Sequence, residues 1–311
     1  LATCWRLQPD LRYLLAICSY LAQVSTRLRG AWSEPAVGGT RESESGMSAW
    51  PLWSSWRERD DDATEWLDAD QMDGHDLERN LRDIRHINAA LGWTAFTTRA
   101  VLRELRAQPN RAWTLLDVAS GSADIPIAIA RAAQRAGITL QVTVTDRSPQ
   151  IVAIARQRRA ALANVTVERQ DALSLPYADG SFDLALCTLA LHHFAPDAAV
   201  ELLRSLARVA RRTLIFDVVR SPLAYAGVVA LTRMARMDPM TCHDGPVSVR
   251  RAYSAAEALA LAHTAGLRHA QANVSFPFRL ALTAGSETGG HDGAARDDAA
   301  DSSAERGSYA L

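Results

Sequence analysis

The sequence predicts an α/β protein built on a mostly parallel sheet with helices on both faces. Three observations predict this class. Residues 113–118 contain an apolar run, Leu115, Leu116 and Val118, interrupted by one acid, as in a strand that is covered on both faces. A turn of small residues, 119–123, passes directly into an apolar helical pattern over 125–136. After that helix, strand-like and helix-like stretches alternate along the chain.

Before the turn, apolar residues recur at three- and four-residue steps from Asp76 to Leu91, and a second helical pattern runs from Thr94 to Ala107. After the turn we expect alternating strands and helices, then a polar stretch, a helix and two strand-like runs. The strands are 140–145, 165–168, 183–187 and 213–218; the helices are 149–162, 197–210, 223–234 and 255–265; the polar stretch is 238–251; the final runs are 268–275 and 278–282.

Composition excludes several classes of protein. With 48% hydrophobic and 22% charged residues among 311, the chain has the make-up of an ordinary globular protein. Its net charge of −1 gives no overall attraction to nucleic acid or to an acidic membrane, so neither is expected as a partner. The four cysteines lack paired metal-site spacing, and no carboxylate cluster shows ligand spacing. We therefore expect free thiols in a reducing cytoplasm and no metal.

The two ends of the chain differ from its middle. Residues 1–46 contain an apolar run, 13–22, that is too short to span a bilayer, and then a Gly/Ser/Glu-rich stretch. We expect a poorly ordered extension there, with Met47 as an alternative start. Residues 285–311 are rich in Gly, Ser and Asp and hold few apolar residues, which predicts a disordered tail.

Acids stand at or just after the ends of three successive expected strands. Asp117 is near the end of the first, Asp146 ends the second, and Asp171 follows the third. Open α/β sheets bind ligands beyond the carboxyl ends of their strands. These acids, and the turn at Gly121 where the backbone can approach a ligand closely, therefore form a candidate binding site. A Leu-His-His-Phe stretch, 191–194, follows the fourth strand of this series.

These motifs resemble those of the class I S-adenosylmethionine (SAM)-dependent methyltransferases. Residues 117–123 are similar to motif I, Asp/Glu-x-Gly-x-Gly-x-Gly, with Ala119 and Ala123 in place of two glycines. The likeness covers roughly residues 113–216 and points to the quinone- and polyketide-tailoring branch. It implies a Rossmann-like sheet of seven strands that closes with an antiparallel hairpin, a methyltransferase domain over 109–284 and an N-terminal helical cap over 47–108. Plain packing of the cap helices against the sheet is the alternative.

The resemblance also implies SAM as the cofactor and assigns residues to it. They belong to four groups, which would contact the amino-acid end, the ribose, the adenine and the sulfonium region. The groups are Asp117, Ala119, Ser120 and Gly121; Asp146 and Arg147; Asp171 and Ala172; and Thr188 and Leu189.

The histidine pair supplies the candidate for acid–base chemistry. A sulfonium methyl is already activated, so placement of the acceptor supplies most of the acceleration. A phenol, with a pKa near ~10, still benefits from a base. Adjacent residues that leave a strand point in opposite directions, so we expect only one of His192 and His193 to face the methyl group, and we favour His193. Structural roles for both are the alternative.

The polar stretch supplies candidate substrate residues. His243 stands beside Asp244, and Arg250 stands beside Arg251. We expect these residues in a loop that reaches the crevice, where His243 would orient a substrate and Arg250 would hold a carboxylate. A solvated surface loop is the alternative.

We therefore expect a cytoplasmic methyltransferase, monomeric or homodimeric, that acts on a small aromatic, phenolic or quinone-like acceptor by in-line displacement. Three alternatives stay open. A nicotinamide-dependent oxidoreductase would place Asp124 at the third glycine of its fingerprint, Gly-x-Gly-x-x-Gly. An RNA-modifying methyltransferase would need a basic stripe with aromatic residues. A non-catalytic relative would not need the acids at Asp117, Asp146 and Asp171.

Overall fold

The computed structural model describes residues 56–285, apart from residues 57, 70–71, 109 and 160–161. The expected extension over residues 1–46 lies outside the described residues, as does the expected tail except for Gly285. The helices are η1 (Trp66–Asp68), α3 (Gly74–Ala90), α4 (Trp93–Arg106), α5 (Asp124–Arg135), α6 (Pro149–Arg158), η2 (Leu191–His193), α7 (Pro196–Val209), α8 (Pro222–Met234), α9 (Pro239–Arg251) and α10 (Ala255–Thr264). The strands are β1 (Trp113–Val118), β2 (Leu140–Asp146), β3 (Val165–Arg169), β4 (Phe182–Thr188), β5 (Ala210–Val218), β6 (Gln271–Ser275) and β7 (Arg279–Gly285).

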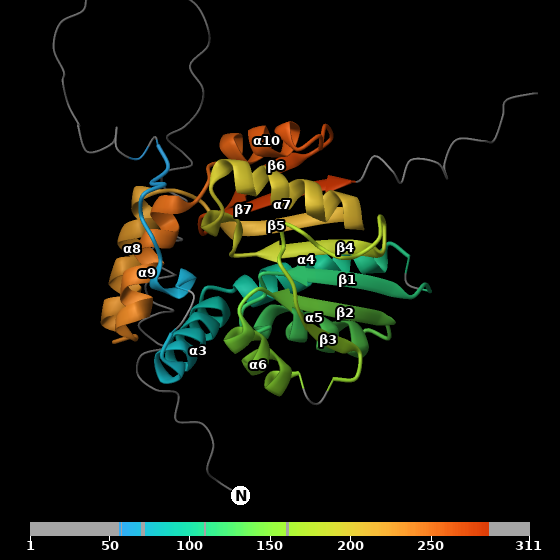
Figure 1. The fold of residues 1–311 in the computed structure, drawn as a ribbon, viewed down its shortest axis with the longest axis horizontal. Helices are drawn as coiled ribbons and strands as arrows, with labels where there is room; N and C mark the ends of the chain where they lie inside the picture. Colours follow the sequence, from blue (N-terminus) through green and yellow to red (C-terminus); the bar gives the residue numbers. More distant parts are fainter. Residues whose placement is uncertain (1–55, 57, 70–71, 109, 160–161, 286–311) are drawn as a thin grey trace, which may run out of the picture.

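The strands form one seven-stranded sheet in the order β3-β2-β1-β4-β5-β7-β6 (Figure 1). The first five in that order are parallel, while β7 is antiparallel to both β5 and β6. The predicted α/β class, the seven strands and the closing hairpin are therefore confirmed. The strand order reverses between β1 and β4, which is the point where open α/β sheets bind their ligands.

Alternating side chains of the strands build a separate core on each face of the sheet. Leu115 packs on one face with α4, α5 and α6, whereas Leu116 and Val118 pack on the other with α7 and α10. All three are fully buried, and burial of such a side chain contributes roughly 2 kcal/mol. The apolar run of β1 therefore reflects a strand that is covered on both faces.

Helices α3, α8 and α9 lie beyond the carboxyl ends of the parallel strands, at the left of Figure 1. Helix α9 contacts α8, α3, η1 and η2, so these elements form one layer, here called the cap. Helix α4, which follows α3 in the sequence, packs mainly against α5 and the sheet. Helix α3 thus packs in the cap and α4 on the sheet, and the cap also includes a segment that follows β5. The expected N-terminal cap over residues 47–108 stays a prediction.

The expectation of a loop over residues 238–251 is wrong, because this stretch forms α9. The side chain of Asp238 accepts a hydrogen bond from the Met240 amide at 3.0 Å and caps the helix, and Pro239 occupies its first turn. Gly245 and Pro246 lie inside the helix, where local propensity disfavours them. A Cβ added at Gly245 would lie 3.0 Å from Val228, so close packing against α8 explains the glycine.

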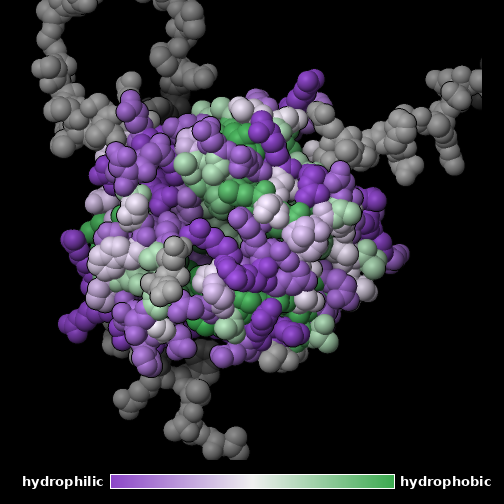
Figure 2. Space-filling model, in the orientation of Figure 1, coloured by the Kyte–Doolittle hydropathy of each residue, from purple (hydrophilic) through white to green (hydrophobic). Residues whose placement is uncertain are grey.

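The molecular face in Figure 2 is mostly hydrophilic, with apolar residues in separate small areas. Across the residues that the structure describes, no helix has both the length and the apolar character needed to cross a bilayer.

Candidate functional site

The turn after β1 holds three successive odd-numbered residues in left-handed backbone conformations. The φ angles of Ala119, Gly121 and Ala123 are 49°, 55° and 59°. The turn is fastened to the end of β2, because the Ser120 amide donates to the Thr145 carbonyl at 3.0 Å. The positions where motif I has glycines are thus the positions that adopt positive φ, and the two alanines keep that backbone at a steric cost.

Asp146 joins the end of β2 to this turn. Its carboxylate accepts hydrogen bonds from the Gly121 amide at 3.1 Å and from the Ser148 amide at 2.9 Å. Burial raises the pKa of Asp146, and these two amides oppose the rise. The side chain therefore orders the turn and also lines the cavity described below. Direct binding of a ribose by Asp146 stays a prediction.

Asp117 does not line the cavity, which corrects the expectation that it would. Its side chain is only 2% exposed beneath the turn, because β1 is covered on both faces. Burial raises its pKa to about 7, although the Ser120 hydroxyl opposes the rise. Its Oδ1 atom has no hydrogen-bond partner among the described residues.

A cavity of about 1170 Å³ opens at the carboxyl ends of β1, β2 and β4, beneath the cap. Pockets that hold one drug-sized ligand reach roughly 1,000 Å³, so this space can accommodate two small molecules. Nine of the ten residues expected to bind SAM line it, namely Ala119, Ser120, Gly121, Asp146, Arg147, Asp171, Ala172, Thr188 and Leu189.

The cap side of the cavity wall combines large apolar side chains with the polar Asn80, Asn88, Thr241, Asp244 and Ser248. The apolar side chains come from the cap helices α3 and α8 and from the turn between β6 and β7. They include Leu81, Ile84, Ala224, Val228, Leu231, Phe276 and Phe278. The motif residues therefore line the cavity at the sheet edge, and most of its large apolar side chains come from the cap and from the turn between β6 and β7.

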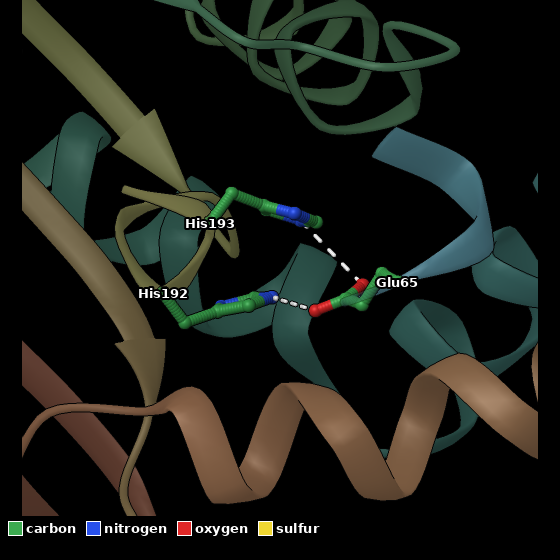
Figure 3. Close-up of side chains that lie close together, drawn as sticks. All are labelled: Glu65, His192 and His193. Carbon is green, nitrogen blue, oxygen red and sulfur yellow. Dashed lines mark ion pairs between the residues drawn. The ribbon is translucent and has the colours of Figure 1, made fainter. Parts of the chain in front are cut away.

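His192 and His193 point in the same direction, contrary to the expectation that they would diverge. They lie in the short helix η2 and not in an extended strand, so strand alternation does not apply. Their ring centroids are 4.4 Å apart with a 32° angle between the planes. Figure 3 shows both rings directed at Glu65, and all three residues line the cavity.

A carboxylate lies beside the Nδ1 atom of each imidazole. In His192, Nδ1 is 2.7 Å from Oδ1 of the buried Asp217 at the end of β5. In His193, Nδ1 is 2.9 Å from Oδ1 of Asp68. Burial alone would raise the pKa of Asp68, but His193 and Arg251 together hold it at about 2.

Sequence reasoning missed Glu65, which is 5% exposed. Its Oε1 lies 3.6 Å from Nε2 of His192, and its Oε2 lies 3.8 Å from Nε2 of His193. Burial raises its pKa to about 7, and His193 opposes the rise. No spacing marks this glutamate within the acid-rich stretch before η1, so no local signal in the sequence could have identified it.

Two arginines and a tyrosine hold the backbone of η2 in place. Arg59 donates to the carbonyl oxygens of His192, at 2.7 Å, and Phe194, at 3.1 Å. Arg251 donates to the His193 carbonyl at 2.7 Å, and the Tyr253 hydroxyl donates to that of Phe194 at 2.7 Å. The orientation of the histidine rings is therefore determined by the segment before α3 and by the end of α9.

His243 and Arg250 do not line the cavity, which corrects their assignment to the substrate. The His243 ring stacks on Trp66 at 4.3 Å between centroids, and Arg250 pairs with Asp60 at 2.7 Å. Asp244 accepts hydrogen bonds from the Trp66 and Leu67 amides at 2.8 and 3.1 Å. These contacts hold the segment that carries Glu65 against α9. His243 and Arg250 lie outside the cavity because residues 239–251 form a helix and not the expected loop.

The chain is similar to known methyltransferases. A family model described as a methyltransferase domain matches residues 115–213. A demethylmenaquinone methyltransferase of Deinococcus radiodurans is 32% identical over 116 residues, which are 37% of this chain and 44% of that protein. One from Staphylococcus epidermidis is 40% identical over 68 residues, which are 22% of this chain and 27% of that protein. The chain thus spans less than half the length of these relatives.

Two solved structures share the fold. The CMeT domain of the citrinin polyketide synthase has a TM-score of 0.51 at 16% identity, covering 64% of this chain and 53% of that one. The DszA carbon methyltransferase has a TM-score of 0.50 at 16% identity, covering 64% and 54%.

The left-handed turn predicts opposite effects for two substitutions. Ala119→Gly should stabilise the fold by up to about 1 kcal/mol, because glycine relieves the strain at φ 49°. Gly121→Ala should destabilise it by about 1 kcal/mol through backbone strain alone, since nothing lies within 4 Å of the added Cβ. Urea unfolding of the ligand-free proteins measures both effects, and shifts of the same sign would contradict this account of the turn.

The raised pKa of Asp117 predicts that its effect on stability depends on pH. The folded state favours the protonated carboxyl, so this stabilising contribution is full below the ordinary pKa of 3.8 and is lost as pH rises to about 7. Between pH 5 and pH 8 the free energy of unfolding of Asp117→Asn should therefore gain roughly 3 kcal/mol relative to the wild type. Urea unfolding at each pH measures this difference, with Asp62→Asn, a change at an exposed aspartate, as the matched control. Equal pH dependence of stability in wild type and Asp117→Asn would refute the raised pKa of Asp117.

Proposed function

We propose that the chain is a class I SAM-dependent methyltransferase and that it methylates a small, largely apolar aromatic acceptor bound under the cap. The observation that carries the proposal is the division of a single cavity into two parts. One part meets the sheet edge with the motif residues, and the other meets the cap with apolar side chains. A transfer enzyme needs this arrangement, because donor and acceptor must share one water-poor space.

The residues at the sheet edge fit SAM. The left-handed turn carries no bulky side chain, and the carboxylate of Asp146 stands beside it at the end of β2. The turn would hold the amino-acid end, Asp146 and Arg147 the ribose, and Asp171 with Ala172 the adenine. Thr188 and Leu189 would lie near the sulfonium. When bound, SAM supplies an electrophilic methyl group, so the protein's main task is to place the acceptor atom in line with it.

The apolar wall supports an aromatic or quinone-like acceptor. Burial of an apolar ring against α3, α8 and Phe276 would favour binding at roughly 25 cal/mol per Å² of apolar surface removed from water. The names of the demethylmenaquinone methyltransferase relatives agree with such an acceptor. A phenolic oxygen of the acceptor is our preferred site of methylation.

We assign proton removal from that hydroxyl to the histidine pair, with His193 as the base and His192 beside it. Asp217 and Asp68 hold the Nδ1 sides of the two rings, so the Nε2 sides remain for an acceptor or for Glu65. The hydrogen bonds of Arg59 and Arg251 to the backbone of η2 keep this orientation before the acceptor arrives. A base positioned in this way typically contributes a factor of ~10² to 10⁴ in rate.

The proposed acceptor chamber can be tested at Gly227 on α8. This residue lines the cavity, and nothing lies within 4 Å of a Cβ added there. Gly227→Leu should raise KM for a naphthoquinol or phenol acceptor at least ~10-fold while the Kd for S-adenosylhomocysteine stays unchanged. Gly227→Ala is the matched control and should stabilise the helix by about 1 kcal/mol with little effect on KM. Methyl transfer from labelled SAM and calorimetry measure the two quantities.

Labelled SAM also separates the proposal from its rivals. Transfer to total RNA with none to a panel of quinols and phenols would refute the small-molecule proposal. A Gly227→Leu variant whose acceptor KM is unchanged would refute the placement of the acceptor under α8.

The base assignment predicts the effect of His193→Gln. Its kcat should fall at least ~100-fold, while the affinity for S-adenosylhomocysteine is retained. His263→Gln, an exposed histidine on α10, is the control and should keep full activity. Unchanged kcat in His193→Gln would refute His193 as the base, and unchanged kcat in the double variant His192→Ala/His193→Ala would leave both histidines with a structural role only.

A further inference from the structure

Glu65, His192 and His193 present three metal-ligating side chains to one point in the cavity wall (Figure 3). They come from two parts of the chain, the segment before η1 and the helix η2. One ligand atom from each residue lies within 4.8 Å of the other two. Glu65 and His192 are 5% and 4% exposed, so water is largely excluded from the Glu65 carboxylate.

Both imidazoles are arranged like metal ligands. Histidines that bind metals usually donate their other ring N–H to a carboxylate, which fixes the tautomer and orients the ring. Here Nδ1 of His192 is hydrogen-bonded to Asp217 at 2.7 Å. Nδ1 of His193 lies 2.9 Å from Asp68 in an ion-pair contact whose angles do not meet hydrogen-bond geometry. With a proton on each Nδ1, each Nε2 directs a lone pair at the carboxylate of Glu65. Two lone pairs and a carboxylate repel one another unless a cation lies between them.

The separations favour a metal ion over shared protons. Charge-assisted hydrogen bonds between nitrogen and a carboxylate oxygen measure about 2.7–2.9 Å. The two Nε2 to carboxylate distances are 3.6 and 3.8 Å. Ligands bound at about 2.1 Å to a tetrahedral ion lie roughly 3.4 Å apart. The three ligand atoms lie within 4.8 Å of one another, so side-chain movements of up to about 1 Å would bring them to that spacing.

The carboxylate of Glu65 supplies a second, independent observation. Its Oε1 atom is buried and has no hydrogen-bond partner among the residues that the structure describes. A buried carboxylate oxygen without a partner carries a large desolvation penalty, which coordination to a cation would offset. The unpartnered oxygen is the one that faces Nε2 of His192.

We propose that Glu65, His192 and His193 bind one divalent first-row transition-metal ion, with Zn²⁺ as the preferred ion. Two imidazoles and one carboxylate form a three-ligand set typical of catalytic zinc sites and of non-haem iron sites, which keep further positions open. Imidazole nitrogens select such ions over Mg²⁺ and Ca²⁺, which prefer oxygen ligands. The open positions face the cavity, because all three ligands line it.

The role of the ion, though not its binding, rests on the proposed function. A cation at this point would favour the ionised form of an acceptor hydroxyl beside it, as metal ions do for bound water. With the ion bound, the two histidines would serve as its ligands, and the ion would take over the task assigned above to a histidine base. Chelation should then lower the rate of methyl transfer without changing the affinity for S-adenosylhomocysteine.

The experiment is a titration of the chelator-treated full chain with Co²⁺, followed by visible absorption and calorimetry. We expect one equivalent per chain with a d–d spectrum of nitrogen and oxygen ligands. Glu65→Gln, which keeps the shape of the side chain but removes its charge, should weaken Co²⁺ binding at least ~10-fold, as should His193→Gln. His263→Gln on α10 is the control and should bind Co²⁺ like the wild type. Unchanged binding of S-adenosylhomocysteine reports that each variant is folded.

Two results would overturn the proposal. One is no saturable Co²⁺ binding by the folded wild type, and the other is equal affinity in wild type, Glu65→Gln and His193→Gln. If Glu65→Gln fails to fold, His193→Gln alone decides the question. Co²⁺ binding that depends on both residues, in a protein that methylates no small acceptor, would support the metal site while refuting the proposed function.

Discussion

The parallel pairing of β1 with both β2 and β4 is the constraint on which the rest of the site depends. It brings the carboxyl ends of these strands to one edge of the sheet, with Asp117 opposite Val144 and Val118 opposite Cys187. Because the strand order reverses between β1 and β4, the helices that follow them leave on opposite faces and a crevice opens between. The turn after β1, the acid at the end of β2 and the histidines after β4 meet there without being neighbours in sequence. The parallel pairing of β4 with β5 likewise places Asp217, at the end of β5, beside His192.

Buried charge then connects this edge to the cap. Glu65, Asp68 and Asp217 surround the two histidines, and Arg59 and Arg251 bind the backbone that carries those histidines. Removing one partner from such a network leaves an uncompensated buried charge at a cost of several kcal/mol. The cap is therefore coupled to this edge of the sheet through electrostatics as well as packing. This coupling explains why the segment before α3 lies against α9, which follows β5 in the sequence. Asp244 of α9 accepts hydrogen bonds from two backbone amides of that segment.

The motif I turn shows how a resemblance can be recognised despite substitutions. Alanines stand at two of its three glycine positions, yet the backbone keeps positive φ at all three. The fold imposes this conformation because the turn must pass from a buried strand into α5 within a few residues while its amides bond to the end of β2. The strain at two alanines, of order 1–2 kcal/mol each, is small beside the energy of the core that surrounds them.

The sequence by itself determined the α/β class, the strands and the motif turn, because these depend on periodicity and local backbone preference over short windows. The closing hairpin was expected only from the resemblance of the motifs to a known family. Nine of the ten expected cofactor residues also reached the cavity, since strand ends are local features that the sheet brings to one edge. Only the tertiary structure decided the rest. It placed Asp117 beneath the turn, made a helix of residues 239–251, turned both histidines the same way and brought Glu65 to them. Each of these outcomes follows from contacts between segments distant in sequence, and such contacts leave no periodic or spacing signal in the chain itself.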